Sequence, residues 1–362
     1  MEQLGPETNR LSGDFPSMTD LPAIEFPLAD PPAYGEVQAI ADGLLWVRIP
    51  LPYLLDHVNV FLLQDHDGWA VVDTGILTPE ALAVWQALFA GPLSGLRISR
   101  VIITHYHPDH IGLAGWFHER HGAQLLTSLS SYTLCQLISQ GRNEQAVRQN
   151  FDFFLRHGMT AETAGLVAIQ GKEFLQRVAP LPTTFQRLVH GDSLTIGGRS
   201  FRVLTGDGHA PEQVMLHCPE EGLFFAADQV LEKISPNISV EATEPTSDPL
   251  GHFLRSLRVI EAEIPDDVLV LAGHRRPFRG LHTRCRELIR HHENRCDIIL
   301  AACADRPHSA AELVPLLFHR PLDPHQMGFA FTETLAHANR LVRRDQLSII
   351  EEKDRTLLAL VR

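Results

Sequence analysis

Short apolar runs and helix-spaced runs alternate along the central part of the chain. The runs at 44–49, 57–63 and 100–104 are apolar and rich in β-branched residues, which predicts buried strands. An Asp67-Gly68 pair ahead of the run at 69–73 predicts a hairpin turn. Apolar positions three or four residues apart predict helices between the strands. Strands interleaved with helices in two halves predict an α/β fold, an αββα sandwich of two sheets covered by helices.

Two segments depart from this alternation before residue 280. Residues 1–34 carry many Pro, Asp, Glu, Ser and Thr without a sustained period, which predicts an extended N-terminal segment, mobile or draped over the surface. Within the main domain, 35–280, residues 128–186 have helical spacing and little strand pattern, so we expect a helical insertion. The helices expected in this insertion are 131–141, 143–157 and 160–178.

Residues 281–362 predict a small C-terminal domain. One long helix is expected at 283–304 and another at 329–344. Between them, Ser309 and Glu312 have the spacing of a capping box and predict the start of a further helix. Two apolar runs around a polar loop follow, and helices followed by such a hairpin predict a winged-helix-like domain.

The composition and charge of the chain limit the classes of protein to which it can belong. The chain has 362 residues, 44% of them hydrophobic, enough for one large core or two smaller ones. No apolar stretch reaches the roughly 18 residues of a membrane span, and the first residues lack the basic and apolar parts of a secretory signal. The five cysteines form no Cys-x-x-Cys pair, which favours free buried thiols in a reducing cytoplasm. The net charge of −13 argues against general affinity for nucleic acid.

The segment 104–110 reads Thr-His-Tyr-His-Pro-Asp-His and carries the strongest chemical signal. It places His105, His107, Asp109 and His110 on a loop between a predicted strand and a predicted helix. Imidazole nitrogens and carboxylate oxygens are the ligands of zinc sites, and a curved loop can aim several of them at one point. A lone His is more often structural or surface-exposed, but this cluster predicts a metal site.

Three further candidates follow later strand-like runs. His209 lies in a glycine-flanked loop, and His274 follows the apolar run 268–273. Asp228 ends the apolar run 223–227, where a carboxylate is costly unless it is paired or bound to metal. Taken alone, either His would be expected to be a surface-loop residue, and Asp228 would be expected to cap a helix. Together with the first motif they predict a set of seven ligands for two metal ions.

With these motifs, residues 40–280 resemble the metallo-β-lactamase superfamily. The resemblance implies a first metal position, a second metal position and a carboxylate that bridges both, as in glyoxalase II-like members. It assigns His105, His107 and His209 to the first position, Asp109, His110 and His274 to the second, and Asp228 to the bridge.

The segment Val72-Asp73-Thr74-Gly75 also matches an early motif of this superfamily. The resemblance implies that Asp73 orients a metal-bound imidazole, and capping of a turn is the alternative. It implies two divalent cations as cofactors, Zn²⁺ first, with iron and manganese as alternatives because His/Asp sites accept all three.

The ligand set predicts a metal-dependent hydrolase. Two cations that share a hydroxide lower the pKa of water toward about 7, so the hydroxide can attack a carbonyl or phosphoryl centre. Asp109 is the expected catalytic residue, because it can orient the nucleophile as well as bind metal. The first motif lacks the Glu of the diiron flavoprotein relatives, which disfavours a redox role. Asp228 stands where true β-lactamases carry Cys or Ser, which disfavours an antibiotic substrate.

The expected substrate is a small acyl thioester, linked to glutathione or coenzyme A, with a lactone or other ester as second choice. Phe153 and Phe154 of the insertion are candidates for an apolar lining, although helix packing explains such a stripe equally well. Arg275, Arg276 and Arg279 follow the last metal His and are candidates for binding a carboxylate or phosphate, with surface ion pairing as the alternative.

Two other readings remain open. The tail resembles the winged-helix tail of the β-lactamase-like protein 2 grouping, which implies a phosphodiesterase or endoribonuclease. Residues 285–362 contain 11 Lys and Arg against 11 Asp and Glu, however, and this neutral balance favours a packing role, with self-association as an option, over nucleic-acid binding. The non-enzymatic alternative is a metal-sensing winged-helix regulator that binds DNA. A complete dinuclear ligand set makes it the weakest, because sensing does not need an open metal centre.

Overall fold

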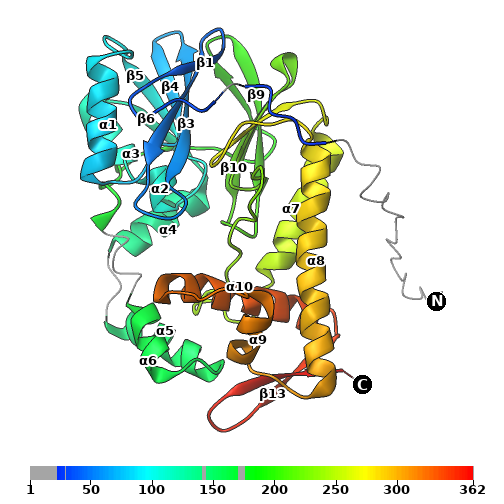
Figure 1. Ribbon diagram of the computed structural model, residues 1–362. Helices are drawn as coiled ribbons and strands as arrows, with labels where there is room; N and C mark the ends of the chain where they lie inside the picture. Colours follow the sequence, from blue (N-terminus) through cyan, green and yellow to red (C-terminus); the bar gives the residue numbers. More distant parts are fainter. Residues whose placement is uncertain (1–22, 29, 141–143, 170–175, 362) are drawn as a thin grey trace, which may run out of the picture.

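A computed structural model describes residues 23–28, 30–140, 144–169 and 176–361. Its centre is a pair of stacked sheets (Figure 1). The seven-stranded sheet has the order β1-β2-β3-β4-β5-β6-β7, antiparallel from β1 to β4 and parallel from β4 to β7. The five-stranded sheet has the order β12-β11-β10-β9-β8, with β11 and β12 parallel.

The first sheet consists of β1 (Gln38–Ala41), β2 (Leu44–Pro50), β3 (His57–Asp65), β4 (Gly68–Val72), β5 (Ile98–Ile102), β6 (Gln124–Thr127) and β7 (Gln186–Arg187). The second consists of β8 (Ser193–Ile196), β9 (Arg199–Gly206), β10 (Gln213–Cys218), β11 (Leu223–Ala227) and β12 (Leu269–Ala272). The helices of this part are α1 (Pro79–Ala90), α2 (Pro108–Ile111), α3 (Ala114–His121) and α7 (Pro249–Glu263).

Three hydrophobic cores separate four layers. Between the sheets, Phe61 of β3 lies edge-on to Phe225 of β11, with 5.5 Å between ring centroids. A second core joins the outer face of the seven-stranded sheet to α1 and α3, where the rings of Trp85 and Phe117 lie 4.8 Å apart. A third core joins the five-stranded sheet to α7, which contributes Phe253, and to the C-terminal helices. The αββα sandwich predicted from the sequence is therefore confirmed.

The helical insertion contains α4 (Leu129–Ser139), α5 (Glu144–Arg156) and α6 (Ala161–Ala168). The helix expected at 160–178 is shorter than predicted, since α6 ends at Ala168; residues 170–175 lie outside the described residues. Helices α5 and α6 lie beside α10 of the C-terminal part (Figure 1). Their apolar residues belong to the same core as those of α10.

The C-terminal part follows the predicted order of helices and hairpin. Its elements are α8 (Leu281–Asp305), α9 (Ala310–Leu317), α10 (Pro324–Arg343), β13 (Leu347–Glu351) and β14 (Thr356–Leu360). Ser309 and Glu312 form the predicted capping box at the start of α9. The α10 helix starts earlier than expected, because Asp323 caps it and Pro324 occupies its first position. The winged-helix character of this part stays a prediction.

The described end of the N-terminal segment lies on the surface of the sandwich. Glu25 forms a two-residue antiparallel bridge with Arg279, while residues 1–22 lie outside the described part of the chain. All five cysteines are buried and free, as expected. None of the described helices is both long and apolar enough to cross a bilayer.

Candidate metal centre

The predicted ligands gather at one edge of the sandwich because they follow the carboxyl ends of strands. Strands β9, β11 and β12 run in the same direction, since β10 is antiparallel to both β9 and β11. Their ends therefore meet at the same edge of the second sheet. The ligands lie after β5 (His105, His107), on α2 (Asp109, His110), after β9 (His209), after β11 (Asp228) and after β12 (His274).

The residues assigned to the first metal position form a compact group. The Nε2 atom of His105 lies 2.9 Å from Nδ1 of His107. The ring of His209 lies 4.5 Å from that of His107, centroid to centroid. One ligand atom from each residue can be chosen so that all three lie within 4.8 Å of one another.

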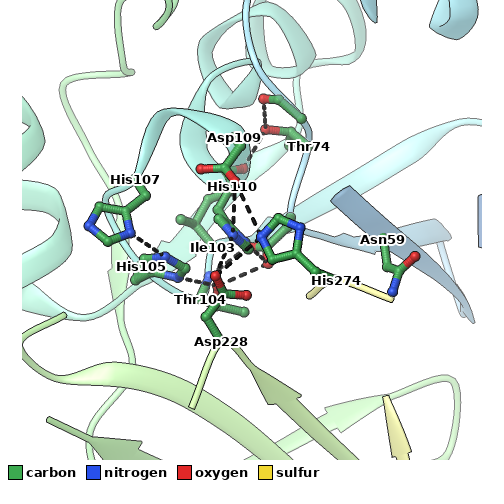
Figure 2. Close-up of polar contacts among 12 residues, drawn as sticks. Asn59, Thr74, Ile103, Thr104, His105, His107, Asp109, His110, Asp228 and His274 are labelled. Carbon is green, nitrogen blue, oxygen red and sulfur yellow. Dashed lines mark hydrogen bonds and ion pairs between the residues drawn. The ribbon is translucent and has the colours of Figure 1, made fainter. Parts of the chain in front are cut away.

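The second group is equally compact, and Asp228 connects the two. Oδ2 of Asp109 lies 3.3 Å from Nε2 of His274 and 3.6 Å from Nε2 of His110. Oδ2 of Asp228 lies 3.2 Å from His274, 3.5 Å from His110 and 3.6 Å from Nε2 of His209 in the first group. Figure 2 shows Asp109 and Asp228 on either side of the imidazoles. The structure thus brings all seven predicted ligands together, with Asp228 in the bridging place.

Hydrogen bonds on the outer side of the cluster fix four of the imidazole rings. Nδ1 of His209 donates to the Asn237 carbonyl at 2.8 Å, and Nδ1 of His274 donates to the His57 carbonyl at 2.7 Å. Nδ1 of His105 lies 3.0 Å from Thr104 Oγ1, and Nδ1 of His110 lies 2.8 Å from Asp73 Oδ2. A carbonyl can only accept, so Nδ1 of His209 and His274 carries the proton. Each Nε2 then faces the cluster and can bind a metal ion once it has lost its own proton.

Asp73 lies where the resemblance placed it, against a ligand. Its carboxylate accepts from the Thr104 amide and the Thr104 hydroxyl, each at 2.9 Å, as well as from His110. Because the Thr104 hydroxyl donates to Asp73, its oxygen is left to accept from Nδ1 of His105. One carboxylate therefore orients a ligand in each group.

Buried polar atoms without partners support a fit to cations. Among the described residues, Nε2 of His110, Nε2 of His209 and Oδ1 of Asp228 are buried and lack a hydrogen-bond partner. Such atoms are costly to bury unless a ligand satisfies them. These three atoms belong to the cluster, and each is of a type that can bind Zn²⁺, iron or manganese.

A second His/Glu group, on α8 and α10, lacks this property. Both ring nitrogens of His292 have partners at 3.1 Å, namely His337 Nε2 and Ser235 Oγ. Glu333 forms a buried ion pair with Arg295, whose charge opposes a cation. We therefore regard this group as a satisfied polar network of the core.

Burial and neighbouring charges set the protonation of the cluster. Burial lowers the pKa of His107 to about 3 and that of His105 well below its ordinary value. Burial also acts on His274, but the Asp228 and Asp109 carboxylates outweigh it and raise its pKa to about 10. The two carboxylates gain more from their imidazole neighbours than burial costs them, so their pKa values are lowered. Ionised carboxylates at the bridge and beside His274 suit divalent cations.

The backbone around the cluster is strained. Asp73, Ala227 and Arg275 adopt left-handed φ angles of 59°, 47° and 67°, which L residues rarely adopt. Each is a supporting residue or a direct neighbour of a ligand. Gly273 has a different role, because a Cβ at this position would lie 2.2 Å from Oδ1 of Asp228. Strain of this kind persists where the surrounding structure enforces a functional geometry.

The five predicted substrate residues are not brought together. Phe153 and Phe154 are buried core residues of α5, and the Phe154 ring lies 5.7 Å from Phe331 of α10. The acyl-lining role expected for them is therefore corrected to helix packing, which was the alternative.

The three arginines differ in their surroundings. Arg276 pairs with Glu232 and lies over the Phe26 ring, and Arg279 donates to the Asp267 carbonyl, so both are engaged in surface contacts. Arg275 is exposed, and within the described parts of the chain its guanidinium forms no ion pair. It is the arginine that directly follows the ligand His274.

Sequence reasoning missed the supports of the His274 loop, His57 and Asn59 of β3. Both are buried polar residues at the start of a strand whose central residues are apolar. That position was a usable signal, because a polar side chain buried in a strand needs a specific partner.

Comparisons with known proteins agree with this geometry. The model of the family described as "Metallo-beta-lactamase superfamily" matches residues 54–291, and that described as "Metallo-beta-lactamase-like, C-terminal domain" matches residues 296–358. The chain is 24% identical over 320 residues to the probable metallo-hydrolase YqjP of Bacillus subtilis, covering 85% of this chain and 94% of the relative. It is 25% identical over 214 residues to a hydroxyacylglutathione hydrolase of Rhodopseudomonas palustris, covering 59% of this chain and 61% of that relative.

Among solved structures, the chain is similar to a beta-lactamase domain protein from Burkholderia ambifaria. The two are 38% identical, with a TM-score of 0.86, and the match covers 93% of this chain and 98% of that one. The family match extends over more than half of the chain and includes every residue of the His/Asp cluster. This chain therefore belongs to the metallo-beta-lactamase superfamily.

Proposed function

We propose that the protein is a dinuclear metal-dependent hydrolase of acyl thioesters linked to glutathione or coenzyme A, with lactones or other esters as the second substrate class. The position of Asp228 is the observation that supports two metal ions in this site. Its Oδ2 atom lies within 3.6 Å of Nε2 of His209 in one group and of His110 and His274 in the other. A carboxylate between two ligand groups is suited to bridge two cations.

The ligand set suits Zn²⁺ first, with iron and manganese as alternatives. Two such cations would supply Lewis acidity and lower the pKa of a bound water toward about 7. Two groups of residues would hold the cations, with Asp228 shared between them. The first group is His105, His107 and His209, and the second is Asp109, His110 and His274.

Asp109 is the residue we assign to catalysis. Its side chain is 21% exposed, whereas those of Asp228 and His274 are 7% and 2% exposed. It therefore forms the solvent-facing part of the second group. From there, its carboxylate can accept a hydrogen bond from an attacking water and orient that water toward the carbonyl carbon.

Two features support a thioester with an anionic carrier. The Arg275 guanidinium is exposed next to His274 and can bind a carboxylate of glutathione or a phosphate of coenzyme A. The Rhodopseudomonas palustris relative is named for hydrolysis of an acylated glutathione. The net charge of −13 and the neutral C-terminal part weigh against a polynucleotide substrate.

A side-by-side turnover assay tests the proposal. Metal-loaded protein is given an acyl-glutathione, an acyl-coenzyme A, a lactone and a single-stranded RNA, with Asp109→Ala as the blank. We expect hydrolysis of a thioester and none in the blank. Turnover that survives in Asp109→Ala would refute the mechanism, and cleavage of RNA alone would refute the substrate class.

A further inference from the structure

Strand β3 holds the loop that carries His274 from outside the cluster. The Asn59 side chain donates through Nδ2 to the carbonyls of Ala272, at 2.9 Å, and Arg275, at 2.8 Å. Its backbone amide donates to the Gly273 carbonyl at 2.7 Å. Asn59 thus binds carbonyls on both sides of the ligand, and Figure 2 shows it on β3 beside the His274 loop.

The orientation of the Asn59 amide is itself fixed. Nε1 of Trp46, on the neighbouring strand β2, donates to Oδ1 of Asn59 at 3.0 Å. An indole nitrogen can only donate, so the amide oxygen must face Trp46 and the NH₂ group must face the His274 loop. With 1% exposure, Asn59 has no access to water as a substitute partner.

His57 holds the same loop at two further points. Its carbonyl accepts from Nδ1 of His274 at 2.7 Å, which fixes the ring of the ligand. Its own Nε2 accepts from the Arg275 amide at 3.1 Å, and its Nδ1 lies 2.6 Å from Asp56 Oδ1. The backbone before and after the His274 side chain is therefore tied to one strand.

These bonds hold a strained backbone after the ligand and a closely packed one before it. Arg275 is held at a φ of 67° while its carbonyl accepts from Asn59. Gly273 packs so closely on Asp228 that no side chain fits there. Without Asn59, we expect Arg275 to relax toward an ordinary φ, which would turn the His274 ring away from Asp109 and Asp228.

We propose that Asn59 and His57 form a clamp that sets the affinity of the second metal position, the one served by Asp109, His110 and His274. Asn59 is its central positioning residue. The first position lacks this dependence, because none of its three ligands lies on the clamped loop. The inference rests on the dinuclear centre proposed above. It adds that altering the clamp residues of β3 weakens metal binding at the second position and leaves the first position unchanged.

Metal content tests the clamp without reliance on activity. Purified Asn59→Ala and the isosteric Asn59→Asp, which keeps the volume but loses both donors, are titrated with Co²⁺ after removal of bound metal. The d–d spectrum and elemental analysis report the two equivalents separately. We expect the second equivalent to bind about 10- to 100-fold more weakly than in the wild type, with the first unchanged.

Asn339→Ala is the matched control. Asn339 also donates through Nδ2 to two loop carbonyls, those of Pro245 at 2.9 Å and Ser247 at 2.8 Å, but on α10 rather than beside a ligand. It should lower thermal stability as Asn59→Ala does, while both Co²⁺ equivalents bind as in the wild type. If Asn339→Ala loses affinity for the second Co²⁺ equivalent as much as Asn59→Ala does, the effect comes from general destabilisation and the clamp is refuted.

Trp46→Phe covers the case in which the Asn59 variants do not fold. It removes the donor that orients the Asn59 amide, together with part of a buried ring, and leaves Asn59 itself in place. We therefore expect a weaker second equivalent, by less than in Asn59→Ala. Unchanged second-site affinity in the folded variants would refute the clamp. A wild-type protein that binds fewer than two equivalents would instead refute the dinuclear centre.

Discussion

Oδ2 of Asp73 lies 2.8 Å from Nδ1 of His110, and both side chains are buried. The same carboxylate accepts two hydrogen bonds from Thr104, whose hydroxyl in turn contacts His105. A single carboxylate outside the cluster thus controls the ring orientation of a ligand in each metal position. The candidate metal centre therefore includes a layer of supporting residues as well as the ligands themselves.

Asp73→Asn should weaken metal binding by about 10- to 100-fold although the volume is unchanged. All three groups around the Asp73 carboxylate are donors: the Thr104 amide, the Thr104 hydroxyl and Nδ1 of His110. Whichever way an asparagine amide turns, its NH₂ group faces one of them. Competition with a chromophoric chelator measures the affinity.

Asp65→Asn provides the control for Asp73. Asp65 also accepts from several donors, among them Arg100 Nε at 2.7 Å and the Gly197 amide at 3.0 Å, at the far end of β3. Its substitution should reduce stability without any change in metal affinity. The assigned role of Asp73 fails if the two variants lose metal to the same degree.

Gly273→Ala should abolish binding of the second cation and most activity. The new Cβ would lie 2.2 Å from Oδ1 of Asp228 and 2.9 Å from Cε1 of His110, so at least one ligand must move. Gly165→Ala in α6 is the counterpart, since nothing lies within 4 Å of its Cβ position. That variant should gain about 0.5–1 kcal/mol of stability, because alanine restricts the unfolded chain, and keep full activity. Metal analysis and thermal unfolding of both variants check these outcomes.

The sequence was sufficient to predict the sandwich and the candidate ligands that the structure brings together. Residues 57–63 and 223–227 indicated buried strands because most of their side chains are apolar, and the structure places β3 and β11 there. The seven candidate ligands were identifiable because each is a metal-binding residue type in a loop or short helix that follows a strand, where strand ends meet.

Other features depend on tertiary contacts that one sequence does not display. The stripe that includes Phe153 and Phe154 has the same spacing whether it covers a substrate or packs on α10, so the choice required the position of the insertion. Arg276 and Arg279 were ambiguous because their partners, Glu232 and Asp267, precede them in the chain without any local pattern. Asn59 was overlooked because its contacts with the His274 loop lie more than 200 residues away in the chain.

Native protein should react slowly with a thiol reagent at pH 8. All five cysteines are buried, and burial raises the pKa of Cys135 to about 11 and that of Cys296 to about 12. The reactive thiolate is scarce below a raised pKa, so its fraction increases only at strongly alkaline pH. We expect five equivalents to react rapidly after denaturation. A rapid equivalent in the native state would contradict the burial of that thiol.

The loop between β2 and β3 is joined to the C-terminal part by a ring stack. The Tyr53 ring lies parallel to the His325 ring in the first turn of α10, with 5.7 Å between centroids and 8° between planes. The Arg177 guanidinium lies 5.3 Å from the centroid of the Tyr53 ring. Because this loop leads directly into His57, the stack connects α10 with the strand that supports His274.

A double-mutant cycle tests this connection. Tyr53→Ala and His325→Ala should each lower the free energy of unfolding, with a coupling of about 0.5 kcal/mol, near the lower end for aromatic pairs because both rings are partly exposed. Tyr53→Phe retains the ring and should retain the coupling with His325→Ala. Additive effects of Tyr53→Ala and His325→Ala would mean that the rings are neighbours without interaction. The loop would then owe its position to β2 and β3 alone.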